Sequence, residues 1–162
     1  MLCANFHYDL CCTVVYLLLI GKNLHICYVF FMSFILASGA ILGFVSVAFG
    51  AYSEHGLKPI VSEEDFRFLM TAIRYNQFNS VIICSIGLFI LGSDKSKIKL
   101  FKASGLIFVI GTFLFSFSIY FSILLKTPSL QYLTPLGGMT LMAAWLMLLI
   151  SALKFKLKEL KP

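Results

Sequence analysis

The sequence predicts an all-α membrane protein, a compact bundle of four transmembrane helices preceded by an extra short apolar segment. Hydrophobic residues make up 60% of the 162 residues and charged residues only 12%, whereas a soluble domain carries about 25% charged residues. The apolar residues fall in blocks of roughly 20, the helix length that crosses a bilayer. Lysines gather at the ends of alternate blocks, as in the cytoplasmic loops of membrane proteins. We therefore assign the net charge of +6 to membrane sidedness and expect no nucleic acid partner.

Residues 1–31 form an apolar N-terminal extension with three interpretations. The uninterrupted apolar run 10–20 is too short to cross a bilayer, and polar residues follow it. A signal peptide would need a basic start and an Ala-x-Ala site, and neither is present. A re-entrant or interfacial segment is the second interpretation. The third, which we favour, is that translation begins at Met32, immediately ahead of a well-formed span.

The first predicted span, residues 32–51, presents one face of small side chains. Gly39 and Gly43 are four residues apart, and Ser46 and Gly50 continue the same face at helical spacing. Small residues allow helices to approach closely, and this close packing drives helix association in lipid. We expect this face to pack within the bundle, with a homodimer seam as the alternative.

A polar connector at residues 52–62 precedes the second predicted span, residues 71–91. Ser62 follows Pro59 and is expected to cap the next helix by accepting from the amide of Asp65 or a neighbour. The intervening residues are amphipathic and are expected to lie at the membrane interface.

The third and fourth predicted spans are residues 103–125 and 135–153, followed by a basic cytoplasmic tail at residues 154–162. Thr134 and Pro135 are expected to be the N-cap and the first helical residue of the fourth span.

The loop charges predict the orientation of this four-span domain, residues 32–153. The loop after the second span and the C-terminal tail carry eight lysines, Lys95, Lys97, Lys99, Lys102, Lys154, Lys156, Lys158 and Lys161. The other two loops are acid-rich or carry a single lysine. The positive-inside rule therefore places both termini of the four-span core in the cytoplasm.

Polar residues from all four spans are expected to converge at the non-cytoplasmic end. This candidate site comprises Glu54, His55, Arg74, Asn76, Asn79, Tyr120, Thr134, Gly137 and Gly138. The entry of the fourth helix, which contains Gly137 and Gly138, is expected to offer exposed amides and a positive dipole end to an anionic group. We expect Arg74 to lie near Glu54, because an uncompensated charge at that depth costs several kcal/mol. The alternative is that Arg74 snorkels to the headgroups and the amides only hold helices together.

No pattern in the chain indicates catalysis or a bound metal. His55 has a carboxylate beside it but no partner at the three- or four-residue spacing of helical metal ligands. The five cysteines show no zinc spacing and are expected to be ordinary apolar side chains. A nucleophile elbow and a phosphate-binding loop are also lacking. We expect a protein that is not an enzyme, with no cofactor and no metal.

Four blocks of the sequence resemble the YgdD-like small membrane proteins, also known as domain of unknown function 423. Gly50-Ala51-Tyr52 with His55-Gly56-Leu57-Lys58 is similar to the family's GAFGAHGLK-type signature, and residues 71–78, 115–120 and 134–138 with Trp145 resemble its later helices. The resemblance covers residues 32–153 and implies four helices in the plasma or inner membrane, with no activity. Two positions depart from the family: Ser53-Glu54 replaces a pair of small residues, and Asn79 replaces a histidine.

Two functions remain compatible with these observations. The first is a structural or accessory multi-pass membrane protein that packs against lipid, a membrane protein partner or further copies of itself. The second is a small-solute or ion pathway that acts as an oligomer, because four helices seldom enclose a pore alone. The direction in which Arg74, Asn76 and Asn79 point distinguishes the two.

Overall fold

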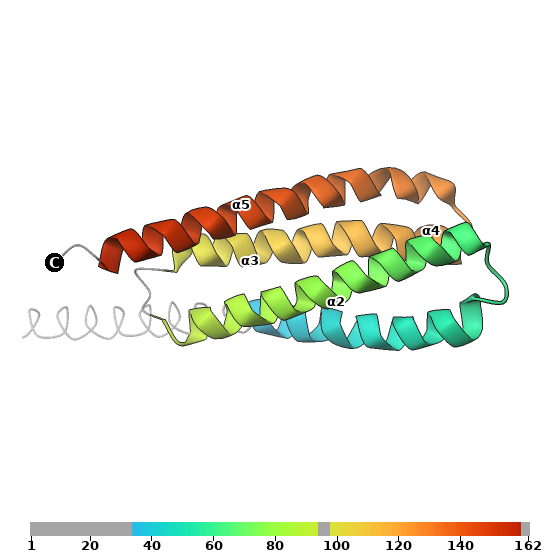
Figure 1. Cartoon of the computed structure of the whole chain (residues 1–162), viewed down its shortest axis with the longest axis horizontal. Coiled ribbons are helices and arrows are strands. Elements are labelled where there is room, and N and C mark those ends of the chain that lie inside the picture. Colours follow the sequence, from blue (N-terminus) through green and yellow to red (C-terminus); the bar gives the residue numbers. More distant parts are fainter. Residues whose placement is uncertain (1–33, 94–97, 160–162) are drawn as a thin grey trace, which may run out of the picture.

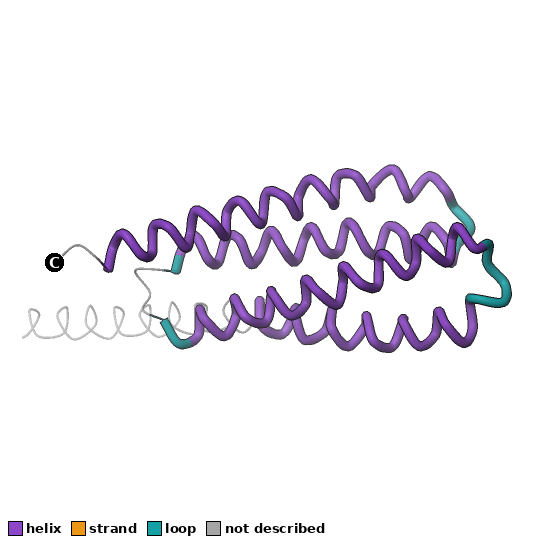
Figure 2. Tube along the Cα trace, in the orientation of Figure 1, coloured by secondary structure: helices purple, strands orange, loops and turns teal. Residues whose placement is uncertain are grey.

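The computed structural model describes residues 34–93 and 98–159, and these are helical apart from short connections (Figure 2). The N-terminal extension, residues 1–31, lies outside the described residues. The elements are an N-terminal helix (residues 34–52), the π-helix η1 (Ser53–Leu57), α2 (Glu63–Leu91), α3 (Lys99–Thr112), the π-helix η2 (Phe113–Phe117), α4 (Ser118–Leu124), the 3-10 helix η3 (Pro128–Leu133) and α5 (Thr134–Glu159).

Four long rods lie side by side in an elongated bundle (Figure 1). The N-terminal helix with η1 forms one rod, and α3, η2 and α4 form another that runs in the same direction. The rods of α2 and α5 run the opposite way. One end of the bundle carries the connections at residues 58–62 and 125–133, and we call it the acidic end. The opposite end, from which the C-terminal tail leaves, is the lysine end.

Three of the four rods are long and apolar enough to cross a membrane, which confirms the all-helical, membrane-type fold. They are Phe34–Leu57, Lys99–Leu124 and Pro128–Phe155, with mean hydropathy values of 2.1, 2.2 and 2.0. The fourth rod, α2, has 29 residues but carries charged and amide side chains in its first half. Because of these side chains, α2 is not among the helices that are apolar enough to cross a membrane by composition alone.

The helix ends test two of the capping predictions. Ser62 Oγ accepts from the Asp65 amide at 3.1 Å, so the predicted N-cap of α2 is confirmed. Thr134 was predicted to cap α5, and this is wrong. Its backbone is already helical, with φ −59° and ψ −45°, because η3 runs directly into α5. Its hydroxyl instead lies 2.8 Å from Ser118 Oγ of α4.

Small residues bring the N-terminal helix close to α2. A Cβ added to Gly39 would lie 2.7 Å from Cys84 Sγ, and one added to Gly43 would lie 3.2 Å from Ser80 Oγ. The predicted seam continues with Ser46, which is fully buried, and with Gly50, which faces Ile73 of α2. This helix also extends beyond Ala51, where the sequence put the end of the first span, and reaches Leu57 through η1.

The interior contains two apolar clusters. The larger one fills the half of the bundle at the lysine end and comprises Ile35, Leu42, Ile83, Ile86, Ile90, Ile98, Phe101, Phe108, Leu141 and Ala144. The smaller one fills the acidic half and comprises Leu57, Leu69, Ala72, Ile73, Ile119 and Tyr120. Three rods contribute to both clusters: the N-terminal helix with η1, the helix α2, and the rod formed by α3, η2 and α4. On each of these rods, buried polar residues lie between the two apolar clusters. We call the six of them nearest the middle of the bundle the polar layer: Ser46, Asn76, Asn79, Ser80, Thr112 and Ser116.

Candidate functional site

The structure divides the nine predicted site residues into three groups. Asn76, Asn79 and Tyr120 are buried in or beside the polar layer; Thr134, Gly137 and Gly138 lie in the first turns of α5; Glu54, His55 and Arg74 are exposed. The nine residues therefore do not form one site, although all of them belong to the acidic half of the bundle.

The buried group joins α2 to α4. Asn76 and Asn79 expose 0% and 2% of their surface, and Tyr120 exposes 2%. Asn76 Nδ2 donates to Tyr120 Oη at 3.5 Å, a long hydrogen bond. The Tyr120 ring also packs on Phe49 of the N-terminal helix, with 4.2 Å between ring centroids. Three helices thus meet around one tyrosine.

Three buried polar atoms have no hydrogen-bond partner within the described parts of the chain. They are Asn76 Oδ1, Asn79 Nδ2 and Ser53 Oγ. A buried polar group without a partner costs about 1–3 kcal/mol, so native proteins contain few of them. Here an unpaired acceptor, Asn76 Oδ1, and an unpaired donor, Asn79 Nδ2, belong to residues three positions apart on α2, on the side that faces the other helices.

The other members of the polar layer are satisfied, mostly by their own helices. Thr112 Oγ1 donates to Phe108 O at 2.7 Å, and Ser46 and Ser80 bond similarly to carbonyls three residues earlier. Ser116 differs, because its hydroxyl donates across helices to Ala72 O of α2 at 3.0 Å. Sequence reasoning missed Ser116 and Ser53 as site residues. For Ser53 a signal existed, since it lies seven residues after Ser46 and continues the same helix face.

Gly137 permits a close contact between α5 and η2. A Cβ at this position would lie 2.7 Å from Phe115 Cα and closer still to the Phe115 backbone nitrogen. At Gly138 the nearest atom would be 3.9 Å away. An open cleft of about 300 Å³ lies beside this contact, and its lining includes Gly138, Thr134 and Gln131.

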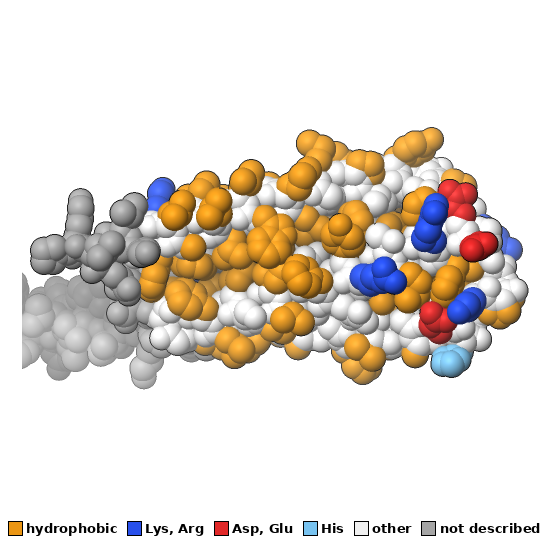
Figure 3. Space-filling model, viewed as in Figure 1, with side chains coloured by type: hydrophobic (Ala, Val, Ile, Leu, Met, Phe, Trp, Pro, Cys, Tyr) orange, Lys and Arg blue, Asp and Glu red, His pale blue; other side chains and the backbone are white. Residues whose placement is uncertain are grey.

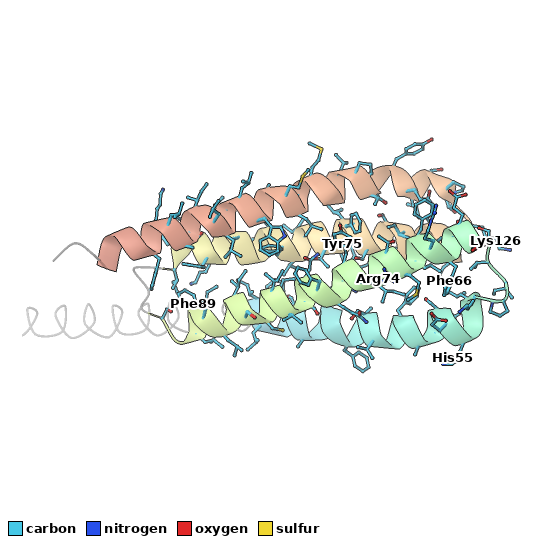
Figure 4. The ribbon with its side chains drawn as sticks, in the orientation of Figure 1. His55, Phe66, Arg74, Tyr75, Phe89 and Lys126 are labelled. Carbon is cyan, nitrogen blue, oxygen red and sulfur yellow. The ribbon has the colours of Figure 1, made fainter. Side chains whose placement is uncertain are left out.

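The exposed group does not assemble as predicted. Glu54 forms an ion pair with Lys58 one turn later, at 2.9 Å. Arg74 makes no ion pair within residues 34–93 and 98–159, so the expected pairing of Arg74 with Glu54 is wrong. Arg74 lies on the outer face of α2 and needs no buried partner, and His55 projects from the acidic end (Figure 4).

Metal-binding side chains do not cluster in the described part of the chain, where no three His, Cys, Asp or Glu residues come together. The groups that do come together are hydroxyls, amides and one phenol. They can donate and accept hydrogen bonds between helices.

Comparisons with known proteins give the family. The family model described as "Protein of unknown function (DUF423)" matches residues 49–138. The UPF0382 inner membrane protein YgdD of Escherichia coli K12 is 31% identical over 125 residues, covering 77% of this chain and 93% of the relative. The UPF0382 membrane protein SH2409 of Staphylococcus haemolyticus is 33% identical over 126 residues, with 76% and 98% covered. No solved structure matches. The chain therefore belongs to the DUF423 family of membrane proteins, as its four signature blocks indicated.

Proposed function

We propose that this chain is a four-span membrane protein without enzymatic activity, which acts as a structural or accessory component packing against lipid or a partner protein. The observation that carries the proposal is the burial of Asn76 and Asn79, which expose 0% and 2% of their surface. Side chains that lined a solute pathway would face a space open to water. These two amides are instead enclosed by packed helices.

The course of the chain supports a fourth crossing by α2. The N-terminal helix ends at the acidic end, and α3 begins at the lysine end (Figure 1). If both cross the membrane, the chain between them must return across it. α2 makes that return while packed between them, since Gly87 of α2 meets Leu36 and Ile86 meets Gly105 of α3.

The length of α2 agrees with this course. Its 29 residues extend about 44 Å at 1.5 Å per residue, which matches a bilayer of about 40–45 Å including its headgroups. A hydrocarbon core of about 30 Å needs only about 20 residues, those from Ala72 to Leu91. The charged start of α2, Glu63 to Arg67, would then lie among the headgroups.

The surface of the bundle supports the proposed orientation. Figure 3 shows apolar side chains along the middle of the visible face and charged side chains gathered at the acidic end. Tyr52, Tyr75 and Tyr132 are exposed in the acidic half, and tyrosines of this kind mark the membrane interface. The lysine-rich segments adjoin the opposite end, which we assign to the cytoplasm, in the cell or inner membrane.

Within this arrangement the polar layer would hold the helices in register. A hydrogen bond between membrane helices contributes about 0.6 kcal/mol on average. The bond from Ser116 to Ala72 and the bond from Asn76 to Tyr120 are of this kind. Close seams at Gly39, Gly87 and Gly137 supply the van der Waals packing.

A small-solute or ion pathway formed by an oligomer is the second candidate. Asn76 Oδ1 and Asn79 Nδ2 favour it, because they are unpaired polar atoms near the middle of the bundle. Such groups in membrane proteins often mark a route for ions or protons. This candidate requires an opening that exposes the two amides.

Reconstitution separates the two candidates. Vesicles containing the wild-type chain would be tested for leakage of protons, potassium and small uncharged solutes, beside vesicles containing the Arg74→Ala, Glu54→Gln and Asn79→Leu variants. The structural proposal expects every preparation to be as tight as empty vesicles. A wild-type flux that these variants abolish, at equal amounts of folded protein, would replace the proposal with the pathway.

A further inference from the structure

An open concavity of about 670 Å³ lies along the first turns of α2, on the outside of the bundle. Its lining consists of Glu63, Glu64, Phe66, Arg67, Met70 and Arg74. It belongs to the charged region at the acidic end (Figure 3), and Figure 4 labels two of its lining residues on α2, Phe66 and Arg74. The α2 residues of the polar layer are buried on the inner side of the same helix, so the concavity is a separate feature.

The spacing of the lining residues along α2 sets their distance from the acidic end of the bundle. Glu63, Arg67, Met70 and Arg74 follow one another at intervals of four, three and four residues, which places them on one face of the helix. Arg74 is 11 residues after Glu63, about 16 Å along the axis. Helical side chains lean toward the N-terminus of their helix, so the Arg74 guanidinium reaches back toward the acidic end. It accordingly lines the same concavity as Glu63 and Glu64.

Neither arginine is neutralised by the described residues around it. Glu63 precedes Arg67 by four residues, the spacing that favours an ion pair on a helix, yet the two form none, and Arg74 forms none either. The Arg67 guanidinium lies 6.0 Å from the Phe68 ring centroid. Two cations and two carboxylates are therefore available to a ligand from outside the bundle.

The charges are complementary to a zwitterion. Two arginines and two glutamates sum to zero, with the carboxylates at the very start of α2 and the guanidinium groups deeper. A phospholipid with an amine headgroup presents the reverse charges in the same order, its ammonium outermost and its phosphate beneath. Arginine binds phosphate oxygens with paired hydrogen bonds, and a primary ammonium donates up to three hydrogen bonds to carboxylates. Phe66 and Met70 line the concavity between these charged groups, at headgroup depth.

We propose that this concavity binds the headgroup of a zwitterionic aminophospholipid in the outer leaflet, Arg67 and Arg74 holding the phosphate and Glu63 and Glu64 the amine. The inference rests on the proposed four-span arrangement, which places Arg74 where the hydrocarbon core begins. A purely anionic headgroup would meet the two carboxylates with its own negative charge. A choline headgroup has no N–H to donate, so its ammonium would be held more weakly.

Native mass spectrometry of the full chain, purified in mild detergent, tests the preference. The probes are phosphatidylethanolamine, phosphatidylglycerol and phosphatidylcholine with identical acyl chains, added at equal concentration. The wild-type chain should retain phosphatidylethanolamine roughly tenfold better than either of the others, a difference of about 1.4 kcal/mol. The Arg67→Gln/Arg74→Gln pair should lose this retention for all three lipids. The Glu63→Gln/Glu64→Gln pair should bind all three about equally.

The matched control is Lys126→Asn, which removes a cation at the same end but outside the concavity. Asparagine tolerates the positive φ of 51° at this residue, and the variant should keep the wild-type lipid preference. Circular dichroism melting of each variant reports whether it is folded. Equal retention of phosphatidylethanolamine by the wild type and the folded arginine pair would overturn the headgroup site, as would a wild-type preference for phosphatidylglycerol.

Labelling in intact cells keeps the two proposals apart. Ile60→Cys and Lys99→Cys, each in the full chain, would be treated with a membrane-impermeant thiol reagent and compared with the unchanged chain. Labelling of Ile60→Cys alone supports the crossing by α2. Labelling of both, or of Lys99→Cys alone, overturns the proposed arrangement and with it the outer-leaflet site. If Ile60→Cys alone is labelled but native mass spectrometry shows no preference for phosphatidylethanolamine, the headgroup site is overturned and the four-span arrangement is kept.

Discussion

The two halves of the bundle differ in how their interiors are built. At the lysine end the core is apolar, and its buried hydroxyls, Ser104 and Ser151, bond to carbonyls of their own helices. At the acidic end the apolar cluster is smaller, and three buried polar atoms lack partners among the described residues. Both π-helices, η1 and η2, also lie in the acidic half.

The difference indicates where the distinctive features of the family lie. The sequence blocks that resemble it, residues 50–58, 71–78, 115–120 and 134–138, come from four separate rods but meet in the acidic half (Figure 1). π-Helices interrupt regular hydrogen bonding and frequently occur at functional sites. The lysine half is built by ordinary apolar packing, whereas the acidic half contains the residues that set this chain apart from a generic bundle.

The largest expected effect is at the contact between α5 and η2, in the acidic half. Gly137→Ala would place a methyl group 2.7 Å from Phe115 Cα, so the backbone of one helix must move. We expect a loss of about 3 kcal/mol in unfolding free energy, at the upper end of overpacking effects. Gly138→Ala is the matched control, because its methyl group would meet nothing within 3.9 Å. Thermal melting in detergent compares the two, and equal melting temperatures would show that α5 does not depend on this contact.

A somewhat smaller effect is expected at the seam in the lysine half. Gly87→Ala would place a methyl group 2.9 Å from Leu36 Cα and 3.0 Å from its Cβ. Rotation of the leucine side chain moves neither of these atoms, so the two helices must separate slightly. The overlap is smaller than at Gly137, and we expect a loss of about 2 kcal/mol. Gly50→Ala serves as the control on the same seam, since its nearest contact, Ile73 Cγ2 at 3.5 Å, is an ordinary one. Chemical unfolding of both variants gives the free energies, and an unchanged Gly87→Ala variant would contradict the seam.

The helices themselves were largely predictable because their signals are local. Apolar blocks of membrane-spanning length, the cap at Ser62 and the small residues of the first span can each be identified from a few neighbouring residues. The π-helix η2 was not predictable. Its sequence, Phe113–Phe117, resembles that of an ordinary membrane helix. The structure places it where Phe115 packs against Gly137 of α5, a contact between segments distant in sequence.

The candidate site was predictable only in part, because side-chain direction depends on tertiary context. Asn76 and Arg74 are two residues apart on α2, yet the first is fully buried and the second is exposed. Helical periodicity separates the two faces, but which face is the inner one depends on where α3 and α4 dock. The prediction for Arg74 failed because its side chain lies on the exposed face of α2 and needs no buried partner there. Thr134 was misassigned because η3 had already begun the helix before it.

A moderate effect should distinguish hydrogen bonds between helices from those within one helix. Ser116→Ala removes the bond to Ala72 O of α2, and we expect it to lower the unfolding free energy by about 1 kcal/mol. Ser104→Ala in the lysine half removes a bond from Ser104 Oγ to Phe101 O in its own helix and should cost less than about 0.5 kcal/mol. Unfolding curves in detergent measure both. A larger loss of unfolding free energy from Ser104→Ala than from Ser116→Ala would contradict the greater contribution that we assign to hydrogen bonds between helices.

The smallest expected effect is the most informative about function. Asn79→Leu replaces a buried amide, whose Nδ2 has no partner in the described chain, with an apolar side chain of similar size. Removing an unpaired buried group is neutral or slightly stabilising, so we expect the unfolding free energy to change by less than about 0.5 kcal/mol. Tyr120→Phe is the control, since it leaves Asn76 Nδ2 without its partner and should cost about 1 kcal/mol. If Asn79→Leu destabilises the bundle as much as Tyr120→Phe, the amide has a structural partner. If it leaves stability intact but removes a vesicle flux that the wild type shows, Asn79 serves a pathway and the structural proposal fails.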